Sequence, residues 1–140
     1  KNAKMTKITK NYKPTKKEKF MNAKMKAYFR QKLLNWKNEL IEGSSQTISK
    51  LQNTQNVAQP DITDRAAEEI ERSFELRTRD RERKLINKID SALKRIDDGT
   101  YGYCEETGEE ISLKRLEARP IATLSIEAQE MHEKSEKRLN

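Results

Sequence analysis

Apolar residues recur between residues 20 and 57 with the spacing of an α-helix. From Met21 to Leu40 the stripe advances by four, four, four, three and four residues, close to the 3.6-residue period of a helix with one buried side. This pattern predicts a long helix with a coiled-coil tendency and a soft spot near Gly43. The stripe consists of Met21, Met25, Phe29, Leu33, Trp36, Leu40, Thr47, Ile48 and Leu51.

A second stripe follows after a short break and predicts a second helix from residue 61 or 62 to 98. Gly99 is a natural C-cap for this helix. Two long stripes joined by a few residues predict an antiparallel hairpin, because neither helix can bury its apolar side alone. The second stripe consists of Ala66, Ile70, Phe74, Arg77, Arg81, Leu85, Ile89, Leu93 and Ile96.

Residues 59–66 form the break and the predicted tip of the hairpin. Pro60 ends the incoming helix, since it fixes φ and disfavours the α conformation of the preceding residue. Asp61 then suits the N-cap of the outgoing helix, and Asp64 lies where the helix dipole favours negative charge. A second interpretation stays open at this point, in which the two carboxylates reach from the end of a rigid arm into a partner.

Residues 100–140 read as a small globular head. Two glycines and Thr107 within residues 101–111 predict a tight turn or small hairpin. Ser112 can cap a short helix that ends before Pro120, and Thr123 or Ser125 can cap a last helix through Leu139. The fold class predicted is therefore mainly α, a long antiparallel coiled-coil hairpin over residues 20–99 followed by a small head.

Composition adds an uneven distribution of charge. The chain is 33% hydrophobic and 38% charged with a formal net charge of +7, and residues 1–19 hold eight lysines and one glutamate. Such a segment is typical of a disordered basic arm. It can be a solubilising tail, or it can be attracted to phosphates or to an acidic protein surface.

Several classes of protein are disfavoured. There is no apolar run of about 18 residues, so we expect no membrane span, and a single cysteine fits a reducing cytoplasm. We expect no enzyme, because no nucleophile, base and orienting group occur together. The same reasoning finds no base-reading motif, so sequence-specific DNA binding is not expected, and the protein is expected to be a monomer.

Four stretches, in one colinear order, resemble the DksA/TraR family of bacterial RNA polymerase-binding regulators. The resemblance implies a protein that enters the polymerase secondary channel with its tip near the active centre, where Asp61, Asp64 and Ala66 would act. With the alarmone ppGpp it would change the lifetime of promoter complexes in the stringent response, repressing ribosomal RNA promoters and activating some biosynthetic ones. The four stretches are residues 61–67, 75–85, 101–104 and 115–120.

The resemblance also assigns a nucleotide site and a metal site. Residues that would hold ppGpp against the polymerase are Arg81, Leu85, Lys88, Arg119 and Gln129, the last of which is usually a lysine in the family. The family's zinc module has four cysteines, which here correspond to Cys104, Thr107, Ser125 and Ala128. Because one thiolate cannot form a closed tetrahedral site, we expect a zinc-independent head with no structural cofactor.

Two other functions remain open from the residues. A transcript-cleavage cofactor of the Gre type shares a hairpin with acidic residues at its tip, which would hold a catalytic Mg²⁺. The head motifs argue against this function. A plain coiled-coil or nucleic-acid adaptor led by the lysine arm is disfavoured, because residues 20–140 carry equal numbers of basic and acidic side chains.

Overall fold

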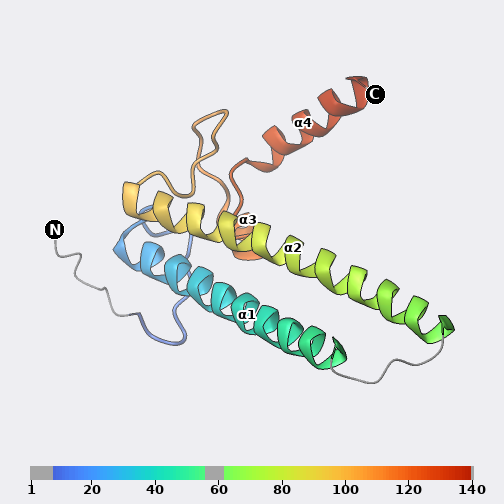
Figure 1. The fold of residues 1–140 in the computed structure, drawn as a ribbon. Helices are drawn as coiled ribbons and strands as arrows, with labels where there is room; N and C mark the ends of the chain where they lie inside the picture. Colours follow the sequence, from blue (N-terminus) through green and yellow to red (C-terminus); the bar gives the residue numbers. More distant parts are fainter. Residues whose placement is uncertain (1–7, 56–61, 140) are drawn as a thin grey trace. The chain divides into compact units, whose positions relative to one another are not determined.

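The structure is a computed structural model that describes residues 8–55 and 62–139, with the backbone alone at 44–55 and 62–63. Within these residues the chain forms four helices, α1 (Ala23–Gln55), α2 (Ile62–Asp98), α3 (Leu113–Ala118) and α4 (Ile126–Leu139) (Figure 1). The predicted mainly α fold, two long helices followed by a small head, is confirmed. No helix in the described part of the chain is long and apolar enough to cross a membrane.

The chain divides into two compact units, and each is described by itself. The head unit comprises Lys1–Leu34 and Asp90–Asn140, and the arm unit comprises Asn35–Ile89. Helix α1 continues through Gly43 without a break, and a Cβ placed on Gly43 would meet nothing within 4 Å. The predicted soft spot therefore does not end the helix.

The core of the head unit begins with the apolar stripe at the start of α1. Met25, Phe29 and Leu33 are fully buried there, at the spacing of four that the sequence shows. The Phe29 ring packs on Tyr101 with centroids 5.6 Å apart, and the Tyr101 hydroxyl donates a hydrogen bond to the Pro120 carbonyl at 2.7 Å. Other core residues of this unit are Ala92, Ile96, Cys104, Ile111, Leu116, Ile121, Ala122 and Ala128.

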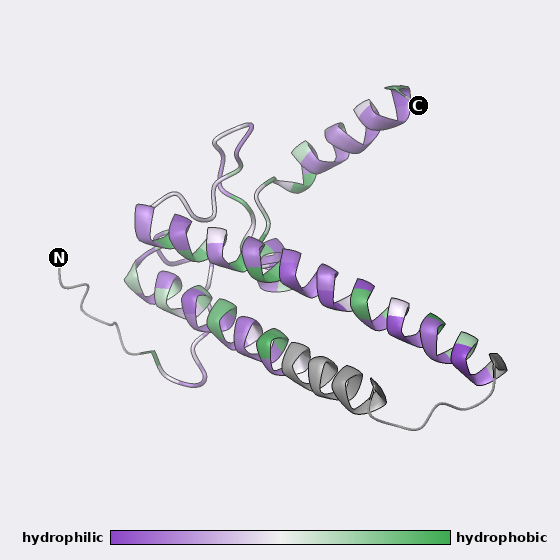
Figure 2. Ribbon diagram, in the orientation of Figure 1, coloured by the Kyte–Doolittle hydropathy of each residue, from purple (hydrophilic) through white to green (hydrophobic). Residues whose placement is uncertain are grey.

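The helices of the head begin where side chains can cap them. Ser112 Oγ accepts the N–H of Arg115 at 3.2 Å and starts α3, while Ser125 Oγ accepts the N–H of Ala128 at 3.2 Å and starts α4. The turn between α2 and α3 is closed by an isolated antiparallel bridge between Tyr103 and Glu110. Hydrophilic residues predominate along α4 (Figure 2), of which only Ala128 is buried.

In the arm unit, burial along α2 decreases toward its N-terminal end. Ile89 is buried and Leu85 is half-buried, but Ile70 and Phe74 are 72% and 67% exposed. This differs from the predicted stripe, in which Ile70 and Phe74 face the other helix. Residues 43–55 of α1 are mostly polar or small in sequence, so they offer α2 little apolar surface to pack against.

The N-terminal segment (residues 8–22) also differs from the disordered arm expected over residues 1–19. Its backbone turns at Thr9–Tyr12, Thr15–Glu18 and Lys19–Asn22, each closed by a hydrogen bond of 3.1–3.3 Å. The Tyr12 ring lies edge-on to Tyr28 of α1 at 6.0 Å, and Phe20 lies edge-on to Tyr103 at 5.4 Å. The aromatic side chains thus attach this segment to the head unit, while residues 1–7 lie outside the described residues.

Candidate functional site

The predicted tip residues lie on both sides of a boundary of the described chain. Asp61 and the predicted tip turn fall outside the described residues, apart from the start of α2. Asp64 lies in the first turn of α2, where the unpaired N–H groups favour a carboxylate, and it is exposed. Ala66 follows and is exposed as well. This end of α2 therefore presents an anion and a small side chain to solvent.

Three of the predicted ppGpp residues lie on α2 in the arm unit. Arg81, Leu85 and Lys88 are spaced by four and three residues, which places them along one side of the helix. Arg81 and Lys88 are exposed and Leu85 is half-buried. A guanidinium and an ammonium along one helix side are suited to phosphate oxygens, with an apolar contact between them.

The other two predicted ppGpp residues lie in the head unit. Arg119 is exposed directly after α3, and its N–H donates to the Arg115 carbonyl at 2.7 Å. Arg115 in turn donates from Nε to the Leu124 carbonyl at 2.8 Å, which ties α3 to the following loop. Gln129, in the first turn of α4, donates from its amide to the Glu133 carboxylate at 3.3 Å. The structure thus brings together members of the set within each unit.

All four positions of the predicted degenerate zinc site lie together around Cys104. The Cys104 thiol is buried, and its sulfur accepts hydrogen bonds from the Thr107 hydroxyl and from the N–H groups of Glu106, Thr107 and Ser125. Burial raises the pKa of Cys104, but these four donors outweigh it and lower the pKa to about 6. Ala128 joins the group through its N–H, which donates to Ser125 Oγ.

The sequence reasoning missed a small charged cluster that links α1 with α3. Glu117 accepts a hydrogen bond from Lys32 Nζ at 2.8 Å and another from the Tyr28 hydroxyl. Although its partial burial raises the pKa of Glu117, these contacts and the nearby Lys13 ammonium lower it below its usual value. Glu117 lies within the 115–120 stretch, but nothing in its spacing indicated a partner 85 residues away in the chain.

Two family models match adjacent parts of the chain. Residues 25–96 match the model described as DnaK suppressor protein DksA, N-terminal domain, and residues 99–134 match the prokaryotic dksA/traR C4-type zinc finger. The first match alone spans more than half of the chain. The chain belongs to the DksA family.

Individual relatives agree with the DksA assignment. The chain is 59% identical over 128 residues to the RNA polymerase-binding transcription factor DksA of Caulobacter vibrioides, covering 91% of this chain and 89% of the relative. It is 46% identical to DksA of Escherichia coli K12, covering 87% and 80%. Among solved structures, transcription factor DksA2 from Pseudomonas aeruginosa superposes with a TM-score of 0.78 at 42% identity, covering 84% and 90%.

The zinc-finger match contradicts the expectation that no zinc is involved. By its description, the DksA/TraR head family is a C4-type zinc finger, and residues 99–134 match it. The inference from three missing cysteines was therefore wrong as a statement about cofactors. The residues that this chain places at the four positions, a thiol, two hydroxyls and a methyl group, do not by themselves form a four-thiolate site. We accordingly derive no functional step through a metal.

Proposed function

We propose that this DksA-family protein binds bacterial RNA polymerase and regulates transcription from within the secondary channel. The observation that carries the proposal is the 59% identity, over 91% of this chain and 89% of the relative, to a protein named RNA polymerase-binding transcription factor DksA. The relatives are named as transcription factors, and we propose that this protein likewise acts by binding and as a monomer, without catalysis. Because bacterial RNA polymerase works in the cytoplasm, this function would be exercised there.

The tip of the hairpin is the proposed effector of this activity. Asp61, Asp64 and Ala66 would lie near the polymerase active centre, where a carboxylate meets donors of the partner in a desolvated interface. The exposure of Asp64 and Ala66 supports this, since both side chains are available to a partner. A small residue at Ala66 would suit a confined channel.

The alarmone ppGpp is the proposed effector molecule. Arg81 and Lys88 on α2, with Arg119 after α3, would contact its phosphates at the polymerase interface, while Leu85 and Gln129 complete the set. Exposed basic groups on one side of α2 support this assignment.

Purified transcription at a ribosomal RNA promoter tests the proposed function. The protein should bind polymerase, shorten the lifetime of open complexes and reduce transcript yield, and ppGpp should increase each effect. RNA cleavage in backtracked complexes, measured in parallel, should be unchanged, because stimulated cleavage would instead identify a Gre-type cofactor. Absence of polymerase binding would reject the proposal.

The Lys88→Ala variant tests the nucleotide site within the same assay. Loss of one phosphate contact should reduce the additional effect of ppGpp severalfold while the effect without ppGpp stays near that of the parent. Lys84→Ala, an exposed lysine one helical turn earlier, is the matched control and should retain the full ppGpp response. Equal loss of both effects in Lys88→Ala would indicate a structural role for Lys88.

A further inference from the structure

Positive charge is concentrated at the beginning of the head unit. Residues 8–34 contain nine lysine or arginine side chains and a single acidic one, Glu18, whereas residues 35–140 contain 18 basic and 22 acidic side chains. The imbalance is therefore local to one part of one unit. The proposed polymerase tip and ppGpp residues make no use of it.

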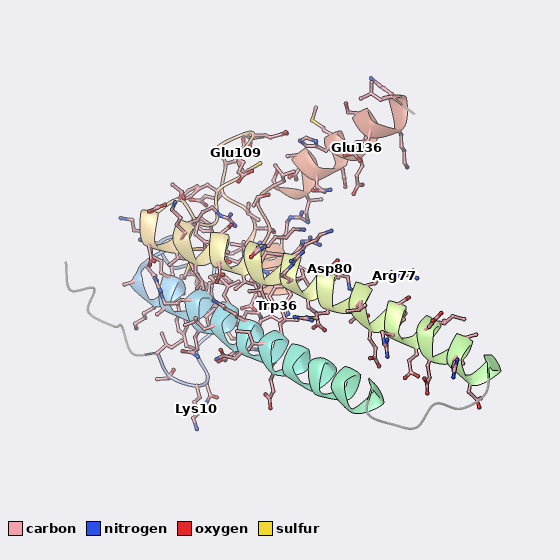
Figure 3. The ribbon with its side chains drawn as sticks, viewed as in Figure 1. Lys10, Trp36, Arg77, Asp80, Glu109 and Glu136 are labelled. Atoms are coloured by element: carbon pink, nitrogen blue, oxygen red, sulfur yellow. The ribbon has the colours of Figure 1, made fainter. Side chains whose placement is uncertain are left out.

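Five lysines of this region define what we call the lysine surface. All five are exposed, and none of them forms an ion pair within the described residues. Figure 3 shows the Lys10 side chain extending outward from the loop that precedes α1. Lys13 is left out because its ammonium already acts on Glu117. The lysine surface consists of Lys10, Lys16, Lys17, Lys19 and Lys24.

Glu18, the one acid of the region, is used to fold the segment. Its carboxylate accepts the Tyr12 hydroxyl at 3.0 Å and the Thr15 N–H at 3.1 Å. Tyr12 in turn packs on Tyr28 of α1. The lysines are consequently carried by an ordered turn structure, and the negative charge that could pair with them is engaged inside it.

The kind of partner follows from the chemistry of lysine. An ammonium is a hydrated point charge on a flexible stem, and lysine is depleted from protein–protein interfaces. A phosphate backbone presents one charge per ~1.7 Å of duplex and requires no fixed geometry from each cation. A folded acidic protein would instead need carboxylates placed to match five flexible stems.

We propose that the lysine surface binds the phosphate backbone of double-stranded DNA without reading its sequence. The chain carries no base-reading motif, in agreement with a contact made to phosphates alone. The proposal goes beyond the polymerase function and is independent of it, since DNA binding by this surface needs no polymerase. A transcription factor with such a surface could hold DNA close to the site where it acts.

The test is binding of the full chain to a fluorescent 30-base-pair duplex of arbitrary sequence, measured by anisotropy between 50 and 200 mM salt without polymerase. If each lysine neutralises one phosphate, the slope of log affinity against log salt is about −4.5, a loss of roughly 500-fold over this range. The variant with all five lysines changed to Gln should lose at least about 100-fold at 50 mM and most of the slope. The Lys16→Gln, Lys17→Gln double variant should reduce the slope by about 2.

The matched control changes five exposed lysines elsewhere, Lys84, Lys94, Lys114, Lys134 and Lys137, to Gln. It has the same net charge as the five-lysine variant and should bind the duplex within about 3-fold of the parent, because only distant, screened charges are lost. Thermal melting of all variants checks that each is folded. Equal loss in the control, or no duplex binding at 50 mM, would overturn the proposal. So would a lysine-surface variant that keeps duplex binding but loses binding to DNA-free polymerase, since the partner would then be an acidic protein.

Discussion

Cys104 shows how much of a side chain's chemistry is set by its neighbours. A buried thiol would ordinarily hold its proton more tightly than in water, but four hydrogen-bond donors converge on this sulfur and favour the thiolate. The donors come from the turn 106–107 and from the start of α4, so the charge on one atom depends on two segments meeting. Cys104 is also the only cysteine of the chain, which makes its titration directly measurable.

We expect Cys104 to contribute stability only at higher pH. Since its pKa falls from 9 to about 6 on folding, the contribution is complete above pH 9, declines as pH falls toward 6 and is absent below that. Thiolate absorbance at 240 nm, titrated with a chelator present, should show a midpoint near pH 6 that is missing in Cys104→Ala. The stability difference between parent and variant should shrink from pH 9 to pH 5. A midpoint above pH 8 would contradict the prediction.

Asp64 allows helix capping and function to be separated. Asparagine is isosteric and keeps the side chain polar, so Asp64→Asn should lower the melting temperature by only about 1–2 °C, since the loss of a charge from the first turn is worth about 0.3–1 kcal/mol. If its carboxylate meets donors in the polymerase, the variant should bind polymerase normally yet fail to shorten open-complex lifetime. Asp61→Asn should be milder in the same assay. An unchanged lifetime effect of Asp64→Asn at saturating concentration would show that the carboxylate acts only on the helix.

At the scale of elements, the contact between the N-terminal segment and the 101–111 turn can be tested through two glycines. Gly102 has φ +89° and a Cβ on it would lie 3.0 Å from Phe20 Cζ and Met21 Cε, whereas Gly108 has φ +73° and open space. Gly108→Ala should cost about 1–2 kcal/mol for its conformation alone. Gly102→Ala should cost about 1 kcal/mol more, because Phe20 and Met21 must move.

Chemical denaturation of both glycine variants measures this difference. Repeating the pair in a Phe20→Ala, Met21→Ala background should bring the two costs together, because the obstructing side chains are then gone. If Gly102→Ala and Gly108→Ala destabilise the parent equally, residues 20–21 do not cover the turn in solution.

The two long helices were predictable because their signals are local and repeated. Stripe spacing, Pro60 and Gly99 gave two helices whose described bounds, Ala23–Gln55 and Ile62–Asp98, lie within a few residues of those expected. Ser112 and Ser125 likewise gave the starts of α3 and α4. Such signals act within one helical turn, so a single sequence is sufficient to read them.

The folded N-terminal segment was not predictable from the same kind of signal. Its attachment depends on Tyr12 meeting Tyr28 and Phe20 meeting Tyr103, contacts in which a single aromatic replaces a periodic stripe. Frequent lysines lowered its apparent hydrophobicity and made it read as disordered. For the candidate site, residue types could be proposed from the resemblance, but the donors around Cys104 and the partners of Glu117 come from the three-dimensional packing.

For the whole molecule, the glycine inside α1 carries a consequence for evolution. Gly43 lies in a continuous helix with no neighbour within 4 Å of a Cβ, so alanine would fit there and should raise the free energy of unfolding by about 0.5–1 kcal/mol. Denaturant melts of Gly43→Ala check this gain, and a loss would reveal a required contact. Selection preserves enough stability for function and seldom more. If the variant is more stable but regulates transcription less well, the unused stabilisation is a measure of how much compliance the protein keeps in the helix.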